Sequence, residues 1–187
     1  MNAFHNEENI RYTTDDIEAL PEGKRAELVD GEMYLMAAPT RRHQRMLGEL
    51  YYAISSYIKN KGGKCEVDQA PFAVYLFNDK YNYFEPDISV ICDPDKLDDK
   101  GCHGAPDWII EIVSPGSQRM DYMLKLFKYE KAGVKEYWIV DIDKEQVRVY
   151  DFAHELADEY SLGSIVNPGI YEDLEIDFAE IMKSVQV

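Results

Sequence analysis

The segment Asp107–Val113 constrains the fold of this chain most, because it is an almost unbroken apolar run between Pro106 and Pro115. Such a run, Asp-Trp-Ile-Ile-Glu-Ile-Val, is typical of a central β-strand that is covered on both faces. Helical spacing follows over Asp121–Ala132, and Glu136–Asp141 is rich in the aromatic and β-branched residues of strands. A strand, a helix and a strand in this order predict two parallel strands with the helix on one face of the sheet.

The segments on either side of this unit add further helices and strands. A short helix is expected to begin at Thr14 and end before Pro21, and the dipeptide Asp30-Gly31 suits a tight hairpin turn. Spaced apolar residues predict a long amphipathic helix over Met46–Ile58, which Gly62-Gly63 would end. The other expected segments are strands at Ala26–Asp30, Glu32–Ala37, Lys64–Ala70, Phe72–Phe77, Ile88–Cys92, Gln146–Asp151 and near Leu174, a polar loop at Asp93–Gly104 and a helix after Asp177. Together they predict one mixed α/β domain over residues 1–187.

The composition is typical of a folded chain that does not cross a membrane. Hydrophobic residues make up 45% of the 187 residues, which excludes global disorder. No apolar run approaches the roughly 20 residues that a membrane-spanning helix needs, and the polar segment Met1–Arg11 is unlike a secretory signal. The cysteines Cys65, Cys92 and Cys102 are odd in number, widely spaced and outside any CxxC pair. A cytoplasmic protein with reduced cysteines is therefore expected.

The charge is strongly acidic but unevenly spread. The sequence has 20 basic and 36 acidic residues, a net charge of −16, which should repel nucleic acid at long range. Between Arg41 and Lys64, however, six residues are basic and one is acidic, whereas Asp141–Val187 holds twelve acidic and three basic residues. The basic segment is compatible with an anion-binding face or with an ordinary solvated helix.

Two acidic residues stand out by their positions. Asp87 follows Pro86 at the start of a predicted strand, and Glu111 lies inside the central apolar run. Burying a carboxylate there is expensive unless it is paired, hydrogen-bonded or bound to a cation, and Mg²⁺ prefers such oxygen ligands. Strand-borne carboxylates could hold a metal against a phosphodiester. Alternatively, Glu111 forms an ion pair and Asp87 caps a turn; a glycosidase pair would need a sugar-binding platform that the sequence does not indicate.

Five sequence motifs resemble those of one protein family. They are Glu27-Leu-Val-Asp-Gly-Glu32, His43-Gln44, Pro86-Asp87, Glu111-Ile-Val-Ser-Pro115 and Lys125-x-x-x-Tyr129-x-x-Ala-Gly-Val-x-Glu-Tyr-Trp-Ile-Val-Asp141. Together they resemble the Uma-type family of restriction endonuclease-like proteins, in the PD-(D/E)XK nuclease superfamily. The likeness runs from about Tyr12 to Phe178. It implies a restriction-endonuclease-like core over about residues 43–151, a mixed sheet flanked by helices with an N-terminal β-hairpin as an extension, and Mg²⁺-dependent phosphodiester hydrolysis, with Mn²⁺ as a substitute.

The resemblance also implies a set of site residues. Asp87 matches the metal-binding aspartate of the superfamily, Glu111 matches its second acid, and the backbone carbonyl of Ile112 would complete the ligands. The lysine expected two residues after the glutamate is absent, because Val113 stands there. Lys125, on the following helix, could bring its ammonium to the same place, orient the attacking water and offset negative charge.

Further residues are implied with less definite roles. The resemblance favours Glu27 as an additional metal ligand, whereas Glu49 on the long helix competes for that role on topology. His43, Asp121 and Tyr129 match motif positions that support the metal ligands or face substrate. Ser114 follows the catalytic strand and could donate a hydrogen bond to Glu111.

Three functions are consistent with these residues. The first is a Mg²⁺-dependent endodeoxyribonuclease in which a metal-activated water attacks DNA; a homodimer would supply two sites for double-strand cleavage. The second is a binding or regulatory protein that keeps the nuclease fold with weak or no activity, which Val113 and the acidic charge favour. The third is a metal-dependent phosphohydrolase that acts on RNA or on a small phosphate ester.

Overall fold

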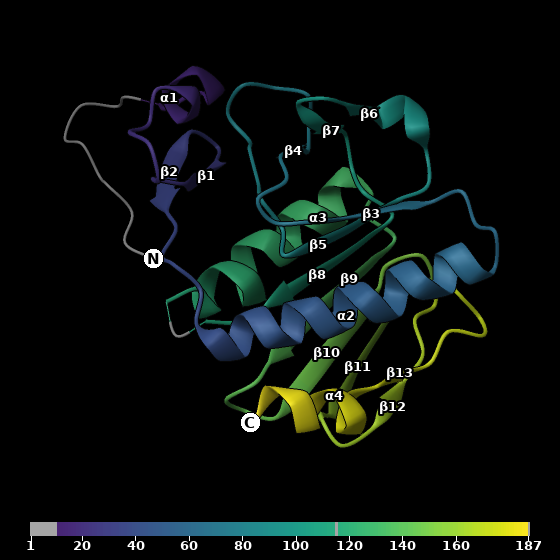
Figure 1. The fold of residues 1–187 in the computed structure, drawn as a ribbon. Coiled ribbons are helices and arrows are strands. Elements are labelled where there is room, and N and C mark those ends of the chain that lie inside the picture. Colours follow the sequence, from purple (N-terminus) through teal and green to yellow (C-terminus); the bar gives the residue numbers. More distant parts are fainter. Residues whose placement is uncertain (1–10, 115, 187) are drawn as a thin grey trace.

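A twisted six-stranded sheet forms the centre of the molecule in a computed structural model, which describes residues 11–114 and 116–186 (Figure 1). Its strand order is β11-β10-β9-β8-β5-β3. These strands are Leu156–Ser161, Gln146–Asp151, Glu136–Asp141, Trp108–Ile112, Ile88–Ile91 and Glu66–Gln69, in that order. The predicted parallel pair is confirmed, because β8 and β9 run parallel while every other neighbouring pair is antiparallel. The mixed α/β class expected from the sequence is therefore correct.

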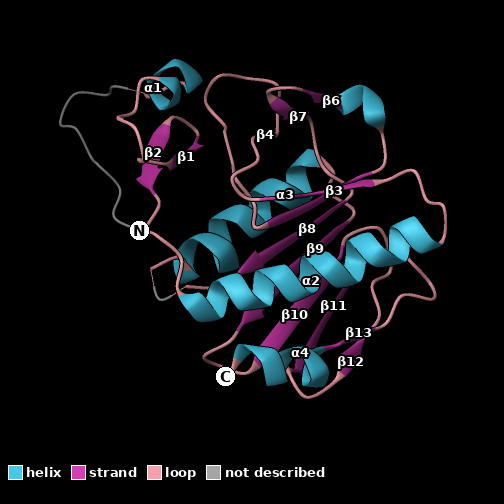
Figure 2. Cartoon of the chain, in the orientation of Figure 1, coloured by secondary structure: helices cyan, strands magenta, loops and turns pink. Residues whose placement is uncertain are grey.

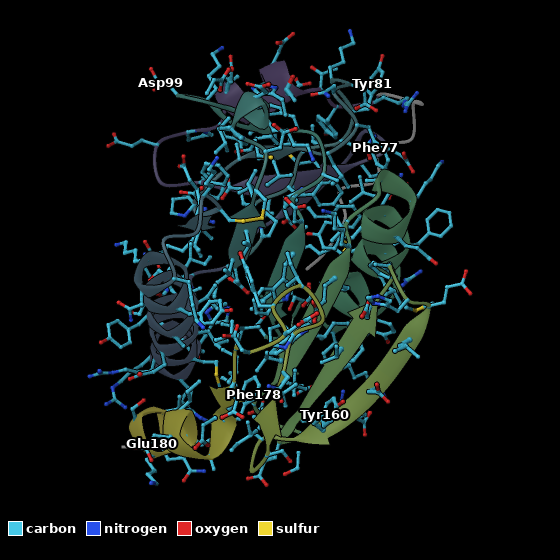
Figure 3. The ribbon with its side chains drawn as sticks, turned by 90° about the vertical axis from the view of Figure 1, so that its right-hand side faces the viewer. Phe77, Tyr81, Asp99, Tyr160, Phe178 and Glu180 are labelled. Atoms are coloured by element: carbon cyan, nitrogen blue, oxygen red, sulfur yellow. A yellow bond between two sulfur atoms is a disulfide. The ribbon has the colours of Figure 1, made fainter. Side chains whose placement is uncertain are left out.

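Helices cover both faces of this sheet. The long helix α2 (Arg41–Asn60) lies across one face, where α4 (Phe178–Val185) packs beside it (Figure 2). The other face is covered by η2 (Met120–Lys125) and α3 (Leu126–Ala132). Figure 3 shows α2 and α3 on opposite sides of the strands. The strands between them alternate, so that Trp108, Ile110 and Ile112 face α2 while Ile109 and Val113 face α3.

The helix α2 follows directly from its sequence pattern. Its apolar residues recur on one face and are buried against the sheet, as predicted: Met46, Leu47, Leu50, Ile54 and Ile58. Thr40 precedes the helix, and its side-chain oxygen accepts a hydrogen bond from the backbone N–H of His43. This cap satisfies one of the free N–H groups at the helix start and fixes where the helix begins.

The helix that joins β8 to β9 differs from the expected regular α-helix. Its first part, η2, is a π-helix, and the chain becomes α-helical at Leu126. Gly133 ends it in the left-handed conformation, with φ of 90°. Single π-helical turns inside helices are rare and are often found at functional sites. Sequence spacing cannot reveal this change, because an inserted residue alters which side chains face inward without altering helix propensity.

A β-hairpin precedes the sheet, as predicted. Strands β1 (Ala26–Val29) and β2 (Glu32–Leu35) are joined by Asp30 and Gly31, both at positive φ. The short helix α1 (Thr14–Glu18) precedes the hairpin. The backbone of Leu28 exchanges hydrogen bonds with that of Tyr83, which attaches the hairpin to the rest of the molecule.

Several peripheral segments differ from the prediction. The expected strand at Phe72–Phe77 is reduced to β4 (Val74–Tyr75), and the expected loop at Asp93–Gly104 contains regular structure. This structure consists of η1 (Pro94–Lys96), β6 (Leu97–Asp98) and β7 (Gly101–His103), and β7 pairs with β4. The edge strand β11, which carries Tyr160, was not predicted because all six of its residues are exposed and leave no apolar signal (Figure 3). Near Leu174, β12 (Ile165–Val166) pairs with β13 (Ile176–Asp177).

The prediction of reduced cysteines is wrong for two of the three. Cys65 and Cys92 form a disulfide, whereas Cys102 is free and buried. Glu66 pairs with Ile91 across β3 and β5, so the next position in that register places the two cysteines opposite each other. Their separation of 27 residues in the chain gave no hint of this contact.

Two further expectations concern membranes and the N-terminus. Among the described residues, none of the helices has the length and apolarity needed to span a membrane. The segment Met1–Arg11 was expected not to be a secretory signal. Of this segment, the structure describes only Arg11.

We predict that Trp108→Ala lowers the free energy of unfolding by about 3–5 kcal/mol, the usual effect of removing a buried aromatic side chain. Trp108 is fully buried in the centre of the sheet, and the centroid of its ring lies 4.9 Å from that of the Trp138 ring. Urea unfolding measures the change. Tyr52→Ala is the matched control, because Tyr52 is 69% exposed on α2 and its loss should leave the unfolding midpoint unchanged. Equal midpoints for both variants would contradict the central position of β8.

Candidate active site

Asp87 and Glu111 are brought together by two neighbouring strands. Ile88 pairs with Ile110 in the antiparallel register of β5 and β8, so the next position places Asp87 directly opposite Glu111. Opposite residues of antiparallel strands project to the same face of the sheet. The pairing is reinforced because the backbone N–H of Ile112 donates a hydrogen bond of 2.7 Å to Oδ2 of Asp87. The two carboxylates singled out in the sequence therefore share one site.

His43 contacts Asp87 from the start of α2. Its Nε2 lies 3.2 Å from Oδ2 of Asp87. Burial lowers the pKa of His43, but a hydrogen bond to Asp87, the negative charge of Asp87 and a hydrogen bond to the Ile112 backbone outweigh burial and raise it above its usual value. The cap at Thr40 thus places a histidine with increased affinity for a proton beside Asp87.

Lys125 lies at the centre of a buried group of carboxylates. Its Nζ is 2.8 Å from Oε1 of Glu111, 3.0 Å from Oε1 of Glu27 and 3.6 Å from Oδ1 of Asp121. Lys125 is 2% exposed, and burial lowers its pKa. The surrounding carboxylates, Glu111 first, outweigh burial and raise the pKa of Lys125 well above its usual range. The side chain therefore remains a cation.

Lys125 does not fully balance the negative charge of the carboxylates around it, and two of their oxygen atoms lack hydrogen bonds. Burial raises the pKa of Glu111 well above its usual range. The positive charge of Lys125 lowers this pKa, but the negative charges of Asp121, Asp87 and Glu27 raise it further. Burial likewise raises the pKa of Asp121 to about 6. Oδ1 of Asp121 and Oε2 of Glu27 are buried without a hydrogen-bond partner. The site thus has more negative charge than Lys125 alone neutralises.

The lysine that reaches this site lies on η2, in the helix that follows β8. Both inward-facing charged residues of η2, Asp121 and Lys125, are buried. One turn later, the hydroxyl of Tyr129 donates a hydrogen bond of 2.8 Å to the same Oε1 of Glu111. Val113, at the position where the superfamily lysine was expected, packs instead in the apolar cluster beneath α3. The ammonium that lies beside Glu111 is that of Lys125, on η2.

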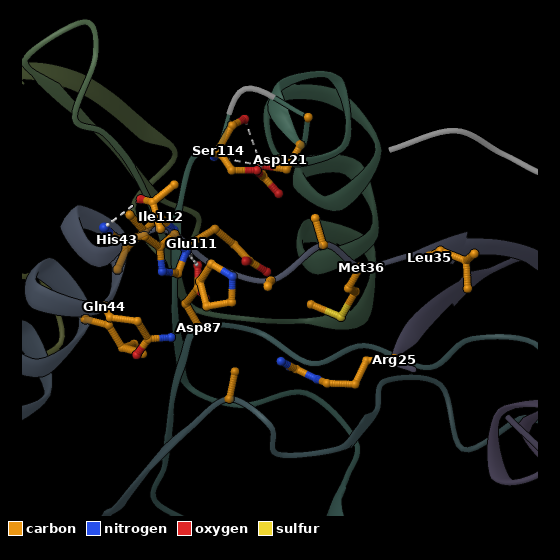
Figure 4. Close-up of a pocket in the computed structure, with 18 of the residues that line it drawn as sticks. Arg25, Leu35, Met36, His43, Gln44, Asp87, Glu111, Ile112, Ser114 and Asp121 are labelled. Atoms are coloured by element: carbon orange, nitrogen blue, oxygen red, sulfur yellow. Dashed lines mark hydrogen bonds and ion pairs between the residues drawn. The ribbon is translucent and has the colours of Figure 1, made fainter. Parts of the chain in front are cut away.

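A cavity of about 250 Å³ opens beside these groups (Figure 4). Asp87, Glu111, Asp121 and Lys125 line it together with the start of α2 and the segment that connects β2 to α2. Figure 4 shows His43 and Gln44 on one side of the carboxylates and Arg25, Leu35 and Met36 on the other. The carboxylate group is thus accessible to a ligand that enters this cavity.

Three other residues predicted from the sequence, Glu27, Glu49 and Ser114, do not make the contacts expected of them. Glu27 contacts Lys125 and accepts a hydrogen bond from the backbone of Glu85, but it does not line the cavity. Glu49 is also outside the cavity lining. The hydroxyl of Ser114 donates to Ser117, 3.1 Å away, rather than to Glu111.

Sequence reasoning did not single out much of the cavity lining, including its polar residues Arg25, Gln44 and Ser117 and the apolar residue Met36. Gln44 belongs to the motif His43-Gln44, and this was the only feature of the sequence that pointed to it. The others come from segments that are distant in sequence and that meet only in the folded chain.

The residues at this site fit a divalent cation. In the described part of the chain, no three His, Cys, Asp or Glu side chains form a ready-made metal-ligand group. The carboxylate residues Asp87 and Glu111 and the neighbouring Ile112 line the cavity, and Mg²⁺ is commonly held by one or two carboxylates with water in its remaining positions. The raised pKa of Glu111 and the Oδ1 atom of Asp121, which has no hydrogen bond and only the ammonium of Lys125, 3.6 Å away, beside it, indicate missing positive charge that a cation would supply.

The fold of this chain has a counterpart among solved structures. It is similar to a crystal structure described as that of "a putative nuclease belonging to DUF820" from Anabaena variabilis, with a TM-score of 0.75. The two share 22% sequence identity, and the match covers 92% of this chain and 98% of that chain. At this level of identity the likeness concerns the fold.

The family follows from the sequence match. The model of the Uma2 family, described as "Putative restriction endonuclease", matches residues 14–177, so this chain belongs to that family. An uncharacterized protein from Synechocystis sp. is 25% identical over 125 residues. That match covers 66% of this chain and 64% of the relative, so it spans less than two thirds of the relative's length.

We predict that Lys125→Met lowers the free energy of unfolding by about 3–5 kcal/mol, because it leaves buried carboxylates without their cation. Adding Glu27→Gln to this variant should recover part of the loss, since one buried negative charge is removed. Urea unfolding at neutral pH without divalent cations measures both effects. Lys183→Met serves as the control, because Lys183 forms its ion pair with Glu180 on the exposed surface of α4. Lack of recovery in the double variant would contradict the charge imbalance described above.

Proposed function

We propose that this chain is a divalent-cation-dependent endodeoxyribonuclease. The observation that carries the proposal is the pairing of Asp87 with Glu111 across β5 and β8, with Lys125 Nζ 2.8 Å from Glu111 and a cavity beside them. Two carboxylates on neighbouring internal strands of a mixed sheet, with an ammonium beside them, provide a cation site and a positive group next to it. Membership of the Uma2 family supports the assignment to nucleases.

The cation would be held by Asp87, Glu111 and the backbone carbonyl of Ile112. We assign Mg²⁺ to this place, with Mn²⁺ as a substitute, because carboxylate and carbonyl oxygens suit both ions. When bound, such a cation supplies the charge that polarises a phosphodiester and activates water for attack on it. His43 contacts Asp87 and the Ile112 backbone from the side of α2, so it orients both ligand groups.

Lys125 would stabilise negative charge on the reacting phosphate and orient the attacking water. Glu27 binds Lys125 at 3.0 Å outside the cavity, so we assign it to holding the ammonium in place rather than to the cation. Asp121 contacts the same ammonium, and the hydroxyl of Tyr129 fixes Oε1 of Glu111. Ser114 and Ser117 shape the rim of the cavity above η2.

DNA must approach despite the net charge of −16. The start of α2 lines the cavity with Thr40 and Gln44, and the positive end of a 20-residue helix favours phosphate there. Arg45 is exposed on the second turn of the same helix and extends this positive region along the surface, whereas the neighbouring Arg42 pairs with Asp143. The basic segment Arg41–Lys64 noted in the sequence therefore begins beside the carboxylates.

We predict that Mn²⁺ raises the melting temperature of the protein and that Asp87→Asn abolishes the rise. A ligand that binds the folded state alone stabilises it by about 2.7 kcal/mol at a concentration of 100 times Kd. Thermal unfolding with increasing Mn²⁺ or Mg²⁺ measures the effect. Asp158→Asn is the control, since Asp158 is exposed on the edge strand β11 and should not alter the response. An equal response of wild type and Asp87→Asn would overturn the ligand assignment.

We predict that wild-type protein nicks supercoiled plasmid in Mg²⁺ or Mn²⁺ and that EDTA stops the reaction. Asp87→Asn should slow nicking by at least about a hundredfold, as loss of an electrostatic contact to the transition state does. Asp158→Asn should cut at the wild-type rate. Cation binding without nicking would favour a binding protein with a nuclease fold, and cleavage of RNA or phosphate esters alone would favour a phosphohydrolase.

A further inference from the structure

The cavity has an apolar wall that the chemistry above does not use. Leu35 at the end of β2, Met36 and the segment 37–39 form this wall, and Leu47 of α2 is a further apolar residue of the lining. In Figure 4, Met36 and Leu35 lie across the cavity from His43 and Gln44, with the carboxylates between them. A site that bound only phosphate and a cation would have no need of such a surface, since both prefer polar groups.

The carboxylates lie below the molecular surface. Glu111 is 4% exposed, and Asp121 is 1% exposed. A DNA duplex is a stiff rod with a persistence length of about 50 nm, and its phosphates are followed closely by stacked, paired bases. A phosphate can reach a recessed group of this kind if its strand leaves the helix, so that sugar and base enter the cavity with it.

The size and charge of the cavity lead to the same conclusion. Its volume of about 250 Å³ lies just below the range of roughly 300–1,000 Å³ typical of small-molecule pockets, so it has room for one nucleotide-sized group. Both cationic side chains among its described lining residues already have carboxylate partners: Arg25 pairs with Glu85, and Lys125 with Glu111. A duplex presents about one charge per 1.7 Å of its axis, about twice the charge density of one of its strands, and neither of these two cations is free to neutralise it.

Resting on the proposed function, we propose that the substrate is single-stranded or locally unpaired DNA, and that one base packs against Met36 and Leu35 while its phosphate lies at Asp87 and Glu111. The thioether of Met36 adapts to flat rings of different shape, so the contact is tolerant of sequence. Enzymes that draw a nucleotide out of a stack act more readily on unpaired strands, because no pairing energy is lost.

The first experiment compares a labelled single-stranded oligonucleotide with the same sequence as a linear duplex. Binding is measured in Ca²⁺, which occupies oxygen sites, and cleavage is measured in Mn²⁺. We expect the single strand to bind at least about tenfold more tightly than the duplex, a difference in affinity that contact with one base can provide. We also expect it to be cleaved faster. Equal or tighter binding of the duplex would overturn the inference, and so would no binding of either form.

The second experiment tests the apolar wall with a double-mutant cycle. Met36→Ala is combined with a single strand that lacks one base at the cleavage position. We expect each change alone to weaken binding about fivefold, and both together to weaken it little further, because they remove the same contact. Leu156→Ala is the matched control, since Leu156 is an apolar residue that is 56% exposed on the edge strand β11. Independent losses would contradict the proposed base contact.

The binding and cleavage measurements separate this inference from the proposed function. Preferred binding of the single strand, with the expected dependence on Met36 but without cleavage, would support the base-binding wall and reject the nuclease. Metal-dependent cleavage of single strand and linear duplex at equal rates would retain the nuclease and reject the preference for unpaired DNA.

Discussion

The buried ammonium of Lys125 is the interaction on which the arrangement of the site depends. It contacts Glu111 on the central strand β8, Glu27 on the N-terminal hairpin and Asp121 on its own helix. Three segments that are distant in sequence are thereby tied to one point. Removing the cation would leave several carboxylates in an apolar environment, where each is expensive to keep ionised. The geometry around Glu111 and the stability of the fold are therefore coupled through a single side chain.

This arrangement leaves the site short of positive charge rather than balanced. The pKa of Glu111 is raised well above its usual range, that of Asp121 is raised to about 6, and an oxygen of Asp121 has no hydrogen-bond partner. A protein that used these acids for stability alone would gain from replacing them with apolar residues. Their persistence beside a cavity is typical of a site whose missing charge is supplied by a ligand. The chain belongs to the Uma2 family, whose description as a restriction endonuclease family agrees with a site of this kind.

The sequence anticipated the central elements because their signals are local. The run at Asp107–Val113, the helical spacing of α2 and the turn at Asp30 and Gly31 are each produced by neighbouring residues, and all three form as predicted. The strand β11 and the pairing of β7 with β4 escaped prediction, because exposed or very short strands depend on partners elsewhere in the chain. The disulfide between Cys65 and Cys92 was missed for the same reason, since the register of β3 and β5 brings the two residues together.

By itself, the sequence determined that Asp87 and Glu111 lie at or in buried strands, where an unpaired carboxylate is unfavourable, and that a mixed sheet would carry them. The tertiary structure alone decided that they face each other, that Glu27 contacts Lys125 without lining the cavity, and that Met36 lies opposite the carboxylates. Lys125 reaches Glu111 from the following helix, as the resemblance implied, but the π-helical form of η2 and the packing of Val113 in the core appear only in the folded chain. The physical reason is that burial and helix propensity are properties of short segments, whereas the meeting of charges depends on strand register and on a helical turn that sequence periodicity does not reveal.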